Sequence, residues 1–157
     1  MTGTMPDAPP PPYKEYATVV LLIDDQAIIA EAVRRALADD ATIQFHAVHE
    51  PSRAVSKAVE VSPTVILLDL VMPDIDGMTV LKFLKANSKL RDIPVIVMSS
   101  KEDKETKIAA FSGGASDYVV KIPEKTELRA RVLAHSKGYI HLLQRNELAK
   151  ALSASKG

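Results

Sequence analysis

The sequence predicts an α/β protein of the doubly wound (βα)5 type, with five parallel strands in the order 2-1-3-4-5. From residue 17 onward, short apolar runs alternate with amphipathic segments. The runs at 19–23 and 64–70 are continuous in Val, Ile and Leu, as strands covered on both faces are. This alternation favours right-handed crossovers that place helices on both faces of the sheet.

Five strands are expected. The runs at 94–100 and 117–121 are similar to the first two, whereas 43–50 is more polar and alternating, as suits an edge strand. The expected strands cover 19–23, 43–50, 64–70, 94–100 and 117–121.

Five helices are expected after these strands. Apolar residues recur at helical spacing in 27–39, and Pro51 suits the first position of the second helix. Ser100 can cap the fourth helix, which Gly113 ends, and Pro123 opens the last one. The expected helices cover 27–39, 51–61, 78–87, 100–114 and about 125–152.

Composition excludes several classes of function. The 20 basic residues equal the 20 acidic ones, so no global basic charge indicates nucleic-acid binding. The absence of cysteine excludes disulfides and thiolate zinc sites. No apolar run approaches the roughly 20 residues of a membrane span, and no secretory signal is apparent, so we expect a cytoplasmic protein without membrane partners.

Charge and proline content divide the chain into three parts. Residues 1–16 hold five of the ten prolines and are expected to form a disordered lead, with a proline-motif ligand as an alternative. Residues 17–135 form the predicted domain. Residues 136–157 extend the last helix, within a region from 122 onward that holds 7 basic and 3 acidic residues.

Polar residues stand where the predicted strands end. In order along the chain, these are Asp24 and Asp25, Asp69, Ser99, and Lys121. In an open α/β sheet the functional crevice lies outside the carboxyl ends of the strands, between strands 1 and 3 for this strand order. We therefore expect three carboxylates, a hydroxyl and an ammonium to meet there.

Three neighbouring carboxylates repel one another unless a cation compensates them. An all-oxygen site favours Mg²⁺, and Mg²⁺ beside Asp69 with a lysine opposite suits phosphoryl transfer to the carboxylate. Each residue alone also fits a plainer explanation, as a cap, a turn residue or a solvated side chain. Because four strand ends all carry a group that phosphoryl transfer needs, we favour the chemical explanation.

Other polar residues are given no chemical role. Asp74 and Asp76 are interpreted as turn residues, since nothing requires them at the metal. The four histidines, which show no ligand spacing with carboxylates, are interpreted as surface or packing residues; they are His46, His49, His135 and His141.

With these motifs the sequence resembles the receiver (CheY-like) domains of bacterial two-component response regulators. The resemblance covers about residues 18–135 and rests on "LLIDDQ", "ILLDLVMPDIDGM", "IPVIVMSS" and "GASDYVVK". Asp69 precedes Ser99 by 30 residues and Lys121 by 52, which are the separations usual in the family. The resemblance implies the flavodoxin-like fold.

The resemblance also implies roles around the acceptor. Asp69 would accept a phosphoryl group from a sensor histidine kinase or a phosphotransfer protein. Asp25 would bind Mg²⁺ directly, Asp24 mostly through water, and the carbonyl oxygen of Val71 would be the third protein ligand.

Further implied roles concern switching. Ser99 would move to hydrogen-bond the phosphoryl oxygens, Lys121 would pair with them, and Tyr118 would turn into the space that Ser99 leaves. The output would be a population shift at the surface of helix 4, strand 5 and helix 5 rather than an enzymatic product.

Two features depart from the family pattern. Ile122 stands between Lys121 and Pro123, where the family usually has proline directly after the lysine, commonly with a cis bond. The positions that tune attack by water hold Val71 and Lys101, which cannot readily orient a water. We therefore expect slow self-dephosphorylation.

The long last helix suggests an output route. Its heptad positions hold Leu128, His135, Leu142 and Ala149 on one seam and Val132, Tyr139 and Asn146 on the other. A homodimer is expected through this helix or through the helix 4, strand 5 and helix 5 surface, with a solvated single helix as the alternative. Such a helix is similar to those that join receivers to diguanylate cyclase domains in Wsp regulators, although no GG[DE]EF signature occurs here.

Two other functions are alternatives to this switch. An aspartyl-phosphate phosphohydrolase would need a second acid two residues after the nucleophile, where Val71 stands. A flavodoxin-like FMN carrier would need a phosphate-binding loop after strand 1, where Asp24 and Asp25 would repel phosphate. No helix-turn-helix segment supports direct DNA binding.

Overall fold

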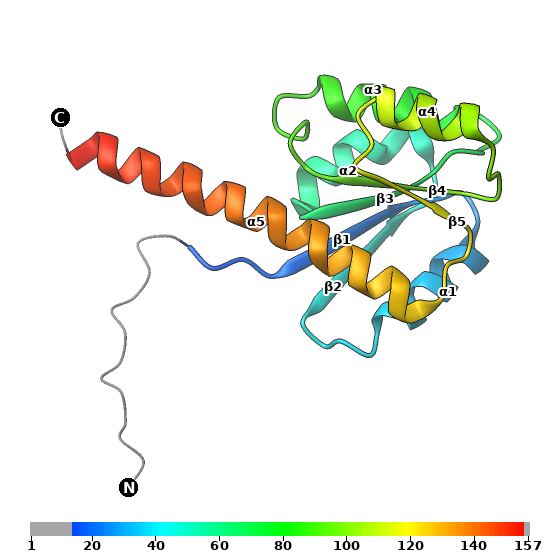
Figure 1. The fold of residues 1–157 in the computed structure, drawn as a ribbon, viewed down its shortest axis with the longest axis horizontal. Coiled ribbons are helices and arrows are strands. Elements are labelled where there is room, and N and C mark those ends of the chain that lie inside the picture. Colours follow the sequence, from blue (N-terminus) through cyan, green and yellow to red (C-terminus); the bar gives the residue numbers. More distant parts are fainter. Residues whose placement is uncertain (1–13, 156–157) are drawn as a thin grey trace, which may run out of the picture.

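The computed structural model describes residues 14–155 and has a parallel five-stranded sheet in the order β2-β1-β3-β4-β5 (Figure 1). The strand order and the parallel pairing confirm the fold predicted from the sequence. The strands are β1 (Thr18–Ile23), β2 (Ile43–Val48), β3 (Val65–Asp69), β4 (Val95–Ser99) and β5 (Asp117–Val120).

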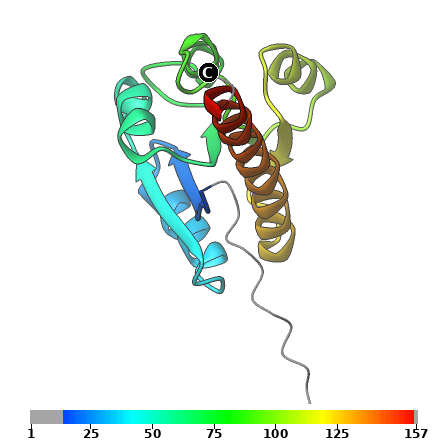
Figure 2. The ribbon, with the colours of Figure 1, turned by 90° about the vertical axis from the view of Figure 1, so that its left-hand side faces the viewer.

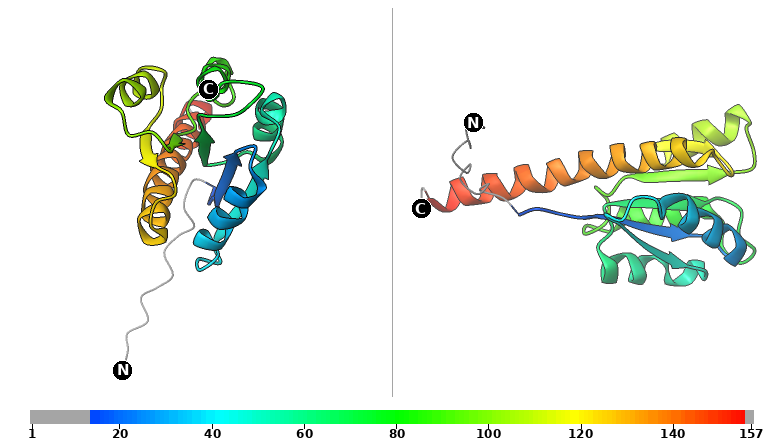
Figure 3. Two further views of the ribbon diagram at one scale, coloured as in Figure 1. Left: turned by 90° about the vertical axis from the view of Figure 1, so that its right-hand side faces the viewer. Right: turned by 90° about the horizontal axis from the view of Figure 1, so that it is seen from below.

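Helices cover both faces of this sheet. α1 and α5 lie on one face, and α2, α3 and α4 lie on the other (Figures 1 and 3). A 3-10 turn, η1 (Pro51–Arg53), precedes α2. The helices are α1 (Ala27–Leu37), α2 (Ala54–Val61), α3 (Gly77–Ala86), α4 (Lys104–Ser112) and α5 (Lys125–Ser155).

The core has two halves, one on each side of the sheet. Successive strand residues point to opposite faces, so Leu21 and Leu68 pack toward α2, α3 and α4, while Val20 and Leu67 pack toward α1 and α5. All four side chains are fully buried. The runs of β1 and β3 are therefore continuously apolar because both faces of these strands are buried, as predicted from the sequence.

Most element boundaries agree with the prediction to within about two residues, and two of the differences bear on the site. The fourth helix begins at Lys104 rather than at residue 100, because the carboxylate of Asp103 accepts the Thr106 backbone N–H at 2.7 Å and caps the helix there. Ser100, the expected cap, lies before this start. β2 ends at Val48, two residues earlier than expected.

α5 packs on the sheet with its first half and projects past it with its second (Figures 2 and 3). Leu128, Val132 and Ser136 are fully buried. The Ser136 hydroxyl lies 2.7 Å from Thr64 Oγ1 and donates to Thr18 Oγ1 at 3.1 Å. These bonds satisfy the buried hydroxyls and fix the helix over the start of β1 and β3.

The segment before β1 contacts the second half of α5. The Lys14 backbone N–H donates to a carboxylate oxygen of Glu147 at 2.9 Å, and the Tyr16 hydroxyl donates to the other oxygen. Two residues of the predicted lead, Lys14 and Tyr16, thus contact α5, whereas 1–13 lie outside the described residues. None of the helices in residues 14–155 is long and apolar enough to cross a membrane.

The turn between β3 and α3 depends on Gly77. Its backbone N–H donates to the Leu70 carbonyl at 3.0 Å. A Cβ atom at this position would lie 2.4 Å from the Asp69 carbonyl oxygen and 2.5 Å from the Leu70 Cα, closer than such atoms approach. The chain must therefore have glycine here to return so tightly past the end of β3.

We predict that Gly77→Ala lowers the free energy of unfolding by about 1–3 kcal/mol, because the backbone around Asp69 must shift to admit the methyl group. Gly138→Ala is the matched control: its Cβ would meet nothing within 4 Å, so alanine should stabilise α5 by up to about 1 kcal/mol. Urea denaturation measures both. Equal effects of the two substitutions would contradict the close approach at Gly77.

Candidate functional site

Three aspartates meet at the carboxyl ends of β1 and β3. Asp24 and Asp25 follow β1, and Asp69 is the last residue of β3. One carboxylate oxygen from each lies within 4.8 Å of the others. This is the position between strands 1 and 3 where the sequence placed the crevice, because the strand order reverses there.

Asp24 is buried and is held by hydrogen bonds from several sides. Its backbone N–H donates to the Val48 carbonyl at 3.2 Å, and its Oδ1 accepts the Gln26 backbone N–H at 2.9 Å. Its own carbonyl oxygen lies 3.0 Å from His49 Nδ1. The loop after β1 is thus attached to the end of β2.

Lys121 is the cation that faces the aspartates. Its Nζ lies 3.0 Å from Asp24 Oδ2 and 3.0 Å from Asp69 Oδ1. Its backbone N–H donates to the Ser99 carbonyl at 2.8 Å, which fixes the chain after β5 beside β4. Burial lowers the pKa of the Lys121 ammonium, but its contacts with Asp69 and Asp24 outweigh burial and hold the pKa above its usual value.

Asp69 is 2% exposed, and burial raises the pKa of its carboxyl. The nearby charge of Asp24 raises it further, whereas Lys121 and the Val71 backbone N–H, 3.3 Å from Asp69 Oδ1, lower it. The net direction is upward. The single ammonium therefore does not fully compensate the carboxylates around it.

The unsatisfied oxygens of this cluster fit a hard divalent cation. Asp25 Oδ1 and Asp69 Oδ2 are buried and accept no hydrogen bond within the described part of the chain, and the buried Asp24 Oδ2 has only the Lys121 ammonium beside it. Buried charged oxygens without partners are costly, and a cation bound among them would remove that cost. Carboxylate oxygens without imidazole or thiolate suit Mg²⁺ or a similar ion.

Ser99 and Tyr118 are joined through Lys101. Ser99, the last residue of β4, is 1% exposed, and its Oγ accepts the Lys101 backbone N–H at 3.0 Å. The Tyr118 ring is also buried, and its hydroxyl donates to the Lys101 carbonyl. The link between the two was not anticipated from the sequence.

The aspartates after β3 lie outside the cluster. Asp76 accepts the Met78 backbone N–H at 3.1 Å and caps α3, while Asp74 is exposed. These positions agree with their interpretation as turn residues.

Two histidines make contacts that sequence reasoning missed. His135 Nε2 lies 3.0 Å from an Asp117 carboxylate oxygen, and His49 contacts the backbone of Asp24. His49 follows the end of β2 directly. The search for polar residues directly after each strand would have found His49 if β2 had been predicted to end at Val48.

The loop after Lys121 has a cis peptide bond between Lys121 and Ile122. The family pattern would have put a cis bond before proline, and here it precedes isoleucine instead. The Ile122 side chain is 45% exposed. Ile122 therefore adds an apolar side chain to the surface beside the cluster.

A model of the response regulator receiver domain matches residues 20–133. The chain is 34% identical over 142 residues to a protein-glutamate methylesterase/protein-glutamine glutaminase of Carboxydothermus hydrogenoformans, covering 82% of this chain and 39% of the relative. It is 36% identical over 115 residues to KdpE, the KDP operon transcriptional regulatory protein of Escherichia coli, covering 73% and 49%. The chain thus spans half or less of these relatives.

Solved structures of response regulators are also similar to this chain. A response regulator from Chloroflexus aurantiacus superposes with a TM-score of 0.72 at 26% identity, covering 78% of this chain and 99% of that one. The Mn²⁺-bound form of response regulator Rcp1 superposes with a TM-score of 0.62 at 26% identity, covering 73% and 88%.

The raised pKa of Asp69 makes the stability of the metal-free protein depend on pH. Because folding raises this pKa, the ionised carboxylate destabilises the fold at pH values above the folded-state pKa. We predict that Asp69→Asn is more stable than wild type at pH 7–8 in EDTA. The difference should shrink as the pH falls through the folded-state pKa and vanish below the unfolded value of about 3.9.

Urea denaturation from pH 8 to pH 4 measures this difference. Asp92→Asn, at an exposed aspartate outside the cluster, is the control, because it also removes one carboxylate from the chain but leaves the cluster intact. A pH-independent advantage of Asp69→Asn would contradict the prediction.

Proposed function

The chain belongs to the response regulator receiver domain family of two-component systems, and we propose that it accepts a phosphoryl group on Asp69 in a Mg²⁺-dependent reaction. One observation carries this proposal above the others. The Asp69 carboxylate is buried between two further aspartates and the Lys121 ammonium, with one oxygen still unpartnered. That is the arrangement a phosphoryl acceptor needs.

The Asp69 carboxylate is the nucleophile of the proposed reaction. Its Oδ1 is engaged by Lys121 and by the Val71 backbone N–H, whereas its Oδ2 accepts no hydrogen bond among the described residues. A bond forms between a carboxylate oxygen of Asp69 and phosphorus as the bond to the donor breaks, and the bonding pair leaves with the donor. The donor is a phosphohistidine of a sensor histidine kinase or phosphotransfer protein.

Charge compensation is the main contribution of the surrounding groups. Asp24, Asp25, Asp69 and the Val71 carbonyl are the proposed ligands of Mg²⁺, which when bound neutralises charge on the transferred phosphoryl group. Lys121 pairs with the same group from the other side.

Switching is proposed to start at Ser99. If Ser99 Oγ turned toward the phosphoryl oxygens, it would release the Lys101 backbone N–H that it now accepts. The carbonyl of the same residue holds the Tyr118 hydroxyl, so Tyr118 and the adjacent β5 surface would be affected as well. A local charge change would thereby shift the population of α4, β5 and α5 arrangements.

The output of the switch is also a proposal. We infer that the chain itself carries no further catalytic activity and acts in the cytoplasm by changing its contacts, with a diguanylate cyclase as one possible output module. The methylesterase activity named for one relative belongs to a protein of which this chain covers only 39%. The phosphohydrolase gains no support, because Val71 stands where a second acid would be needed. The FMN carrier gains none either, because the aspartates after β1 would repel its phosphate.

We predict that a small phosphodonor such as acetyl phosphate adds one phosphoryl group to the wild-type chain in Mg²⁺ and none in EDTA. Intact mass measures the gain. Asp69→Asn should gain nothing, whereas Asp92→Asn should behave as wild type. Labelling of Asp69→Asn, or none of wild type, would refute the proposal. The loss of label with time tests the expected slow self-dephosphorylation, which a half-life of seconds would contradict.

Homodimer formation is proposed through α4, β5 and α5. Leu128 and Val132 of the predicted heptad seam are fully buried against the chain's own sheet, so a seam between two chains can begin only near Leu142. We therefore propose the surface beside β5 as the main dimer contact. Lys107 lies 5.9 Å from the Tyr118 ring, and Phe111, one helical turn later, is 49% exposed.

We predict that Phe111→Glu prevents dimer formation by the beryllofluoride-treated protein, because it places charge in an apolar contact. Phe83→Glu is the matched control, since Phe83 is 56% exposed but lies on α3. Light scattering coupled to size exclusion measures the mass. A dimer that survives Phe111→Glu, or is lost equally in both variants, would exclude this surface.

A further inference from the structure

The Asp25 carboxylate is positioned by its backbone rather than by partners of its own. Its Oδ1 is buried without a hydrogen bond, and no other hydrogen bond to its carboxylate occurs in residues 14–155. Asp24 is different, because its carboxylate contacts Gln26 and Lys121. The direction in which Asp25 points therefore depends on the peptide unit that precedes it.

That peptide unit is held by His49. The Asp24 carbonyl oxygen lies 3.0 Å from His49 Nδ1, and since a carbonyl can only accept, Nδ1 must carry the proton. The carbonyl of Asp24 and the N–H of Asp25 lie in one planar group. Fixing the carbonyl thus fixes the rotation of the peptide from which the Asp25 side chain departs.

A second contact holds the other side of Asp24. The Asp24 backbone N–H donates to the Val48 carbonyl at 3.2 Å, so Val48 and His49 hold the two successive peptide units around Asp24. Val48 does this with its backbone, as any residue could. His49 does it with its side chain, and only a side chain with a suitably placed donor can replace it.

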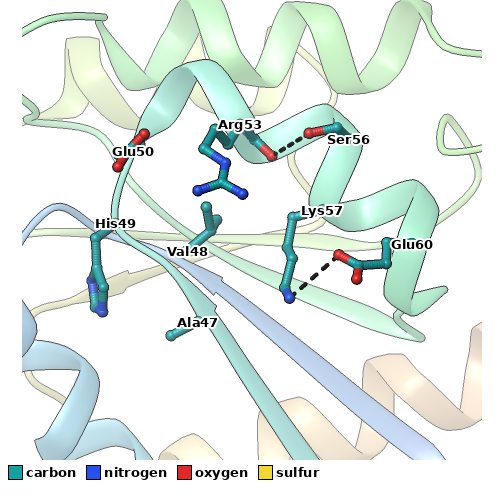
Figure 4. A pocket seen from close by; sticks show the side chains of 8 residues that line it. All are labelled: Ala47, Val48, His49, Glu50, Arg53, Ser56, Lys57 and Glu60. Atoms are coloured by element: carbon teal, nitrogen blue, oxygen red, sulfur yellow. Dashed lines mark hydrogen bonds and ion pairs between the residues drawn. The ribbon is translucent and has the colours of Figure 1, made fainter.

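The surroundings of the ring indicate a hydrogen-bonding role rather than a packing role. His49 is exposed and stands at the side of an open cavity of about 440 Å³ beside α2 (Figure 4). It also lines a cavity of about 250 Å³ that Asp25 borders. A ring between two open cavities contributes little buried apolar area, so its loss should affect the Asp24 carbonyl more than the core.

We propose that His49 is a positioning residue for the divalent cation: its Nδ1–H holds the Asp24–Asp25 peptide so that the unpartnered Asp25 carboxylate faces the other two aspartates. This inference rests on the proposed function, because it assigns His49 to the same metal-dependent acceptor site. His49 does not touch the reacting atoms. It acts through the backbone of Asp24.

The test compares His49→Asn with His49→Leu, since the two side chains have nearly the same shape but only asparagine keeps a donor near the position of Nδ1. His46→Leu is the control, because it removes a histidine from the same strand region without a contact to Asp24 among the described residues. For each variant, calorimetry gives the dissociation constants of Mg²⁺ and Mn²⁺, and thermal unfolding in EDTA gives the stability without metal.

We expect His49→Leu to raise the metal dissociation constant roughly tenfold, as losses of residues that orient a ligand do, and His49→Asn to stay within about twofold of wild type. The labelling rate of His49→Leu by acetyl phosphate should recover at saturating Mg²⁺. Unfolding temperatures in EDTA should agree among the His49 variants, because the packing contribution is small.

Three results would overturn the inference: unchanged metal affinity in His49→Leu, equal losses in the asparagine and leucine variants, or an equal loss in His46→Leu. Failure of the proposed function has a different signature. In that case wild type itself would neither bind the cation nor accept the phosphoryl group, whatever stands at residue 49.

Discussion

The ion pairs of Lys121 with Asp24 and Asp69 are the constraint on which the rest of the site depends. Three carboxylates at the end of a buried sheet repel one another, and one ammonium offsets only part of that repulsion. The remainder is expressed in the raised pKa of Asp69 and in two buried oxygens, Asp25 Oδ1 and Asp69 Oδ2, that have no partner among the described residues. The repulsion is therefore concentrated at one place in the fold, where a bound cation would relieve it.

Sequence reasoning succeeded where chain topology determines position. Because parallel strands end at one edge of the sheet, the residues that terminate β1, β3 and β5 could be brought together from their order alone. It failed where a boundary depended on a local hydrogen bond. The cap at Asp103 and the early end of β2 moved two boundaries by a few residues, and the second of these hid His49.

The heptad pattern of α5 shows a different limit of sequence reasoning. Apolar residues at Leu128 and Val132 have the spacing of a coiled coil, but in the structure they fill the chain's own core. A pattern of spacing records which helix face is apolar and does not record what covers it. The contact of Lys14 and Tyr16 with Glu147 was equally invisible, since it joins residues more than 130 positions apart.

The buried Ser136 hydroxyl has a mechanical consequence for α5. It is bonded to Thr18 and Thr64 at the pole of the sheet opposite the aspartates, and so it provides a fulcrum. At 1.5 Å per residue, about 17 Å of helix lies on the Lys125 side of this point and about 29 Å on the other. A tilt about Ser136 would therefore carry the far tip through nearly twice the arc of the near end, in the opposite direction. The helix has the proportions of a lever whose short arm begins four residues after Lys121, the ion-pair partner of Asp69.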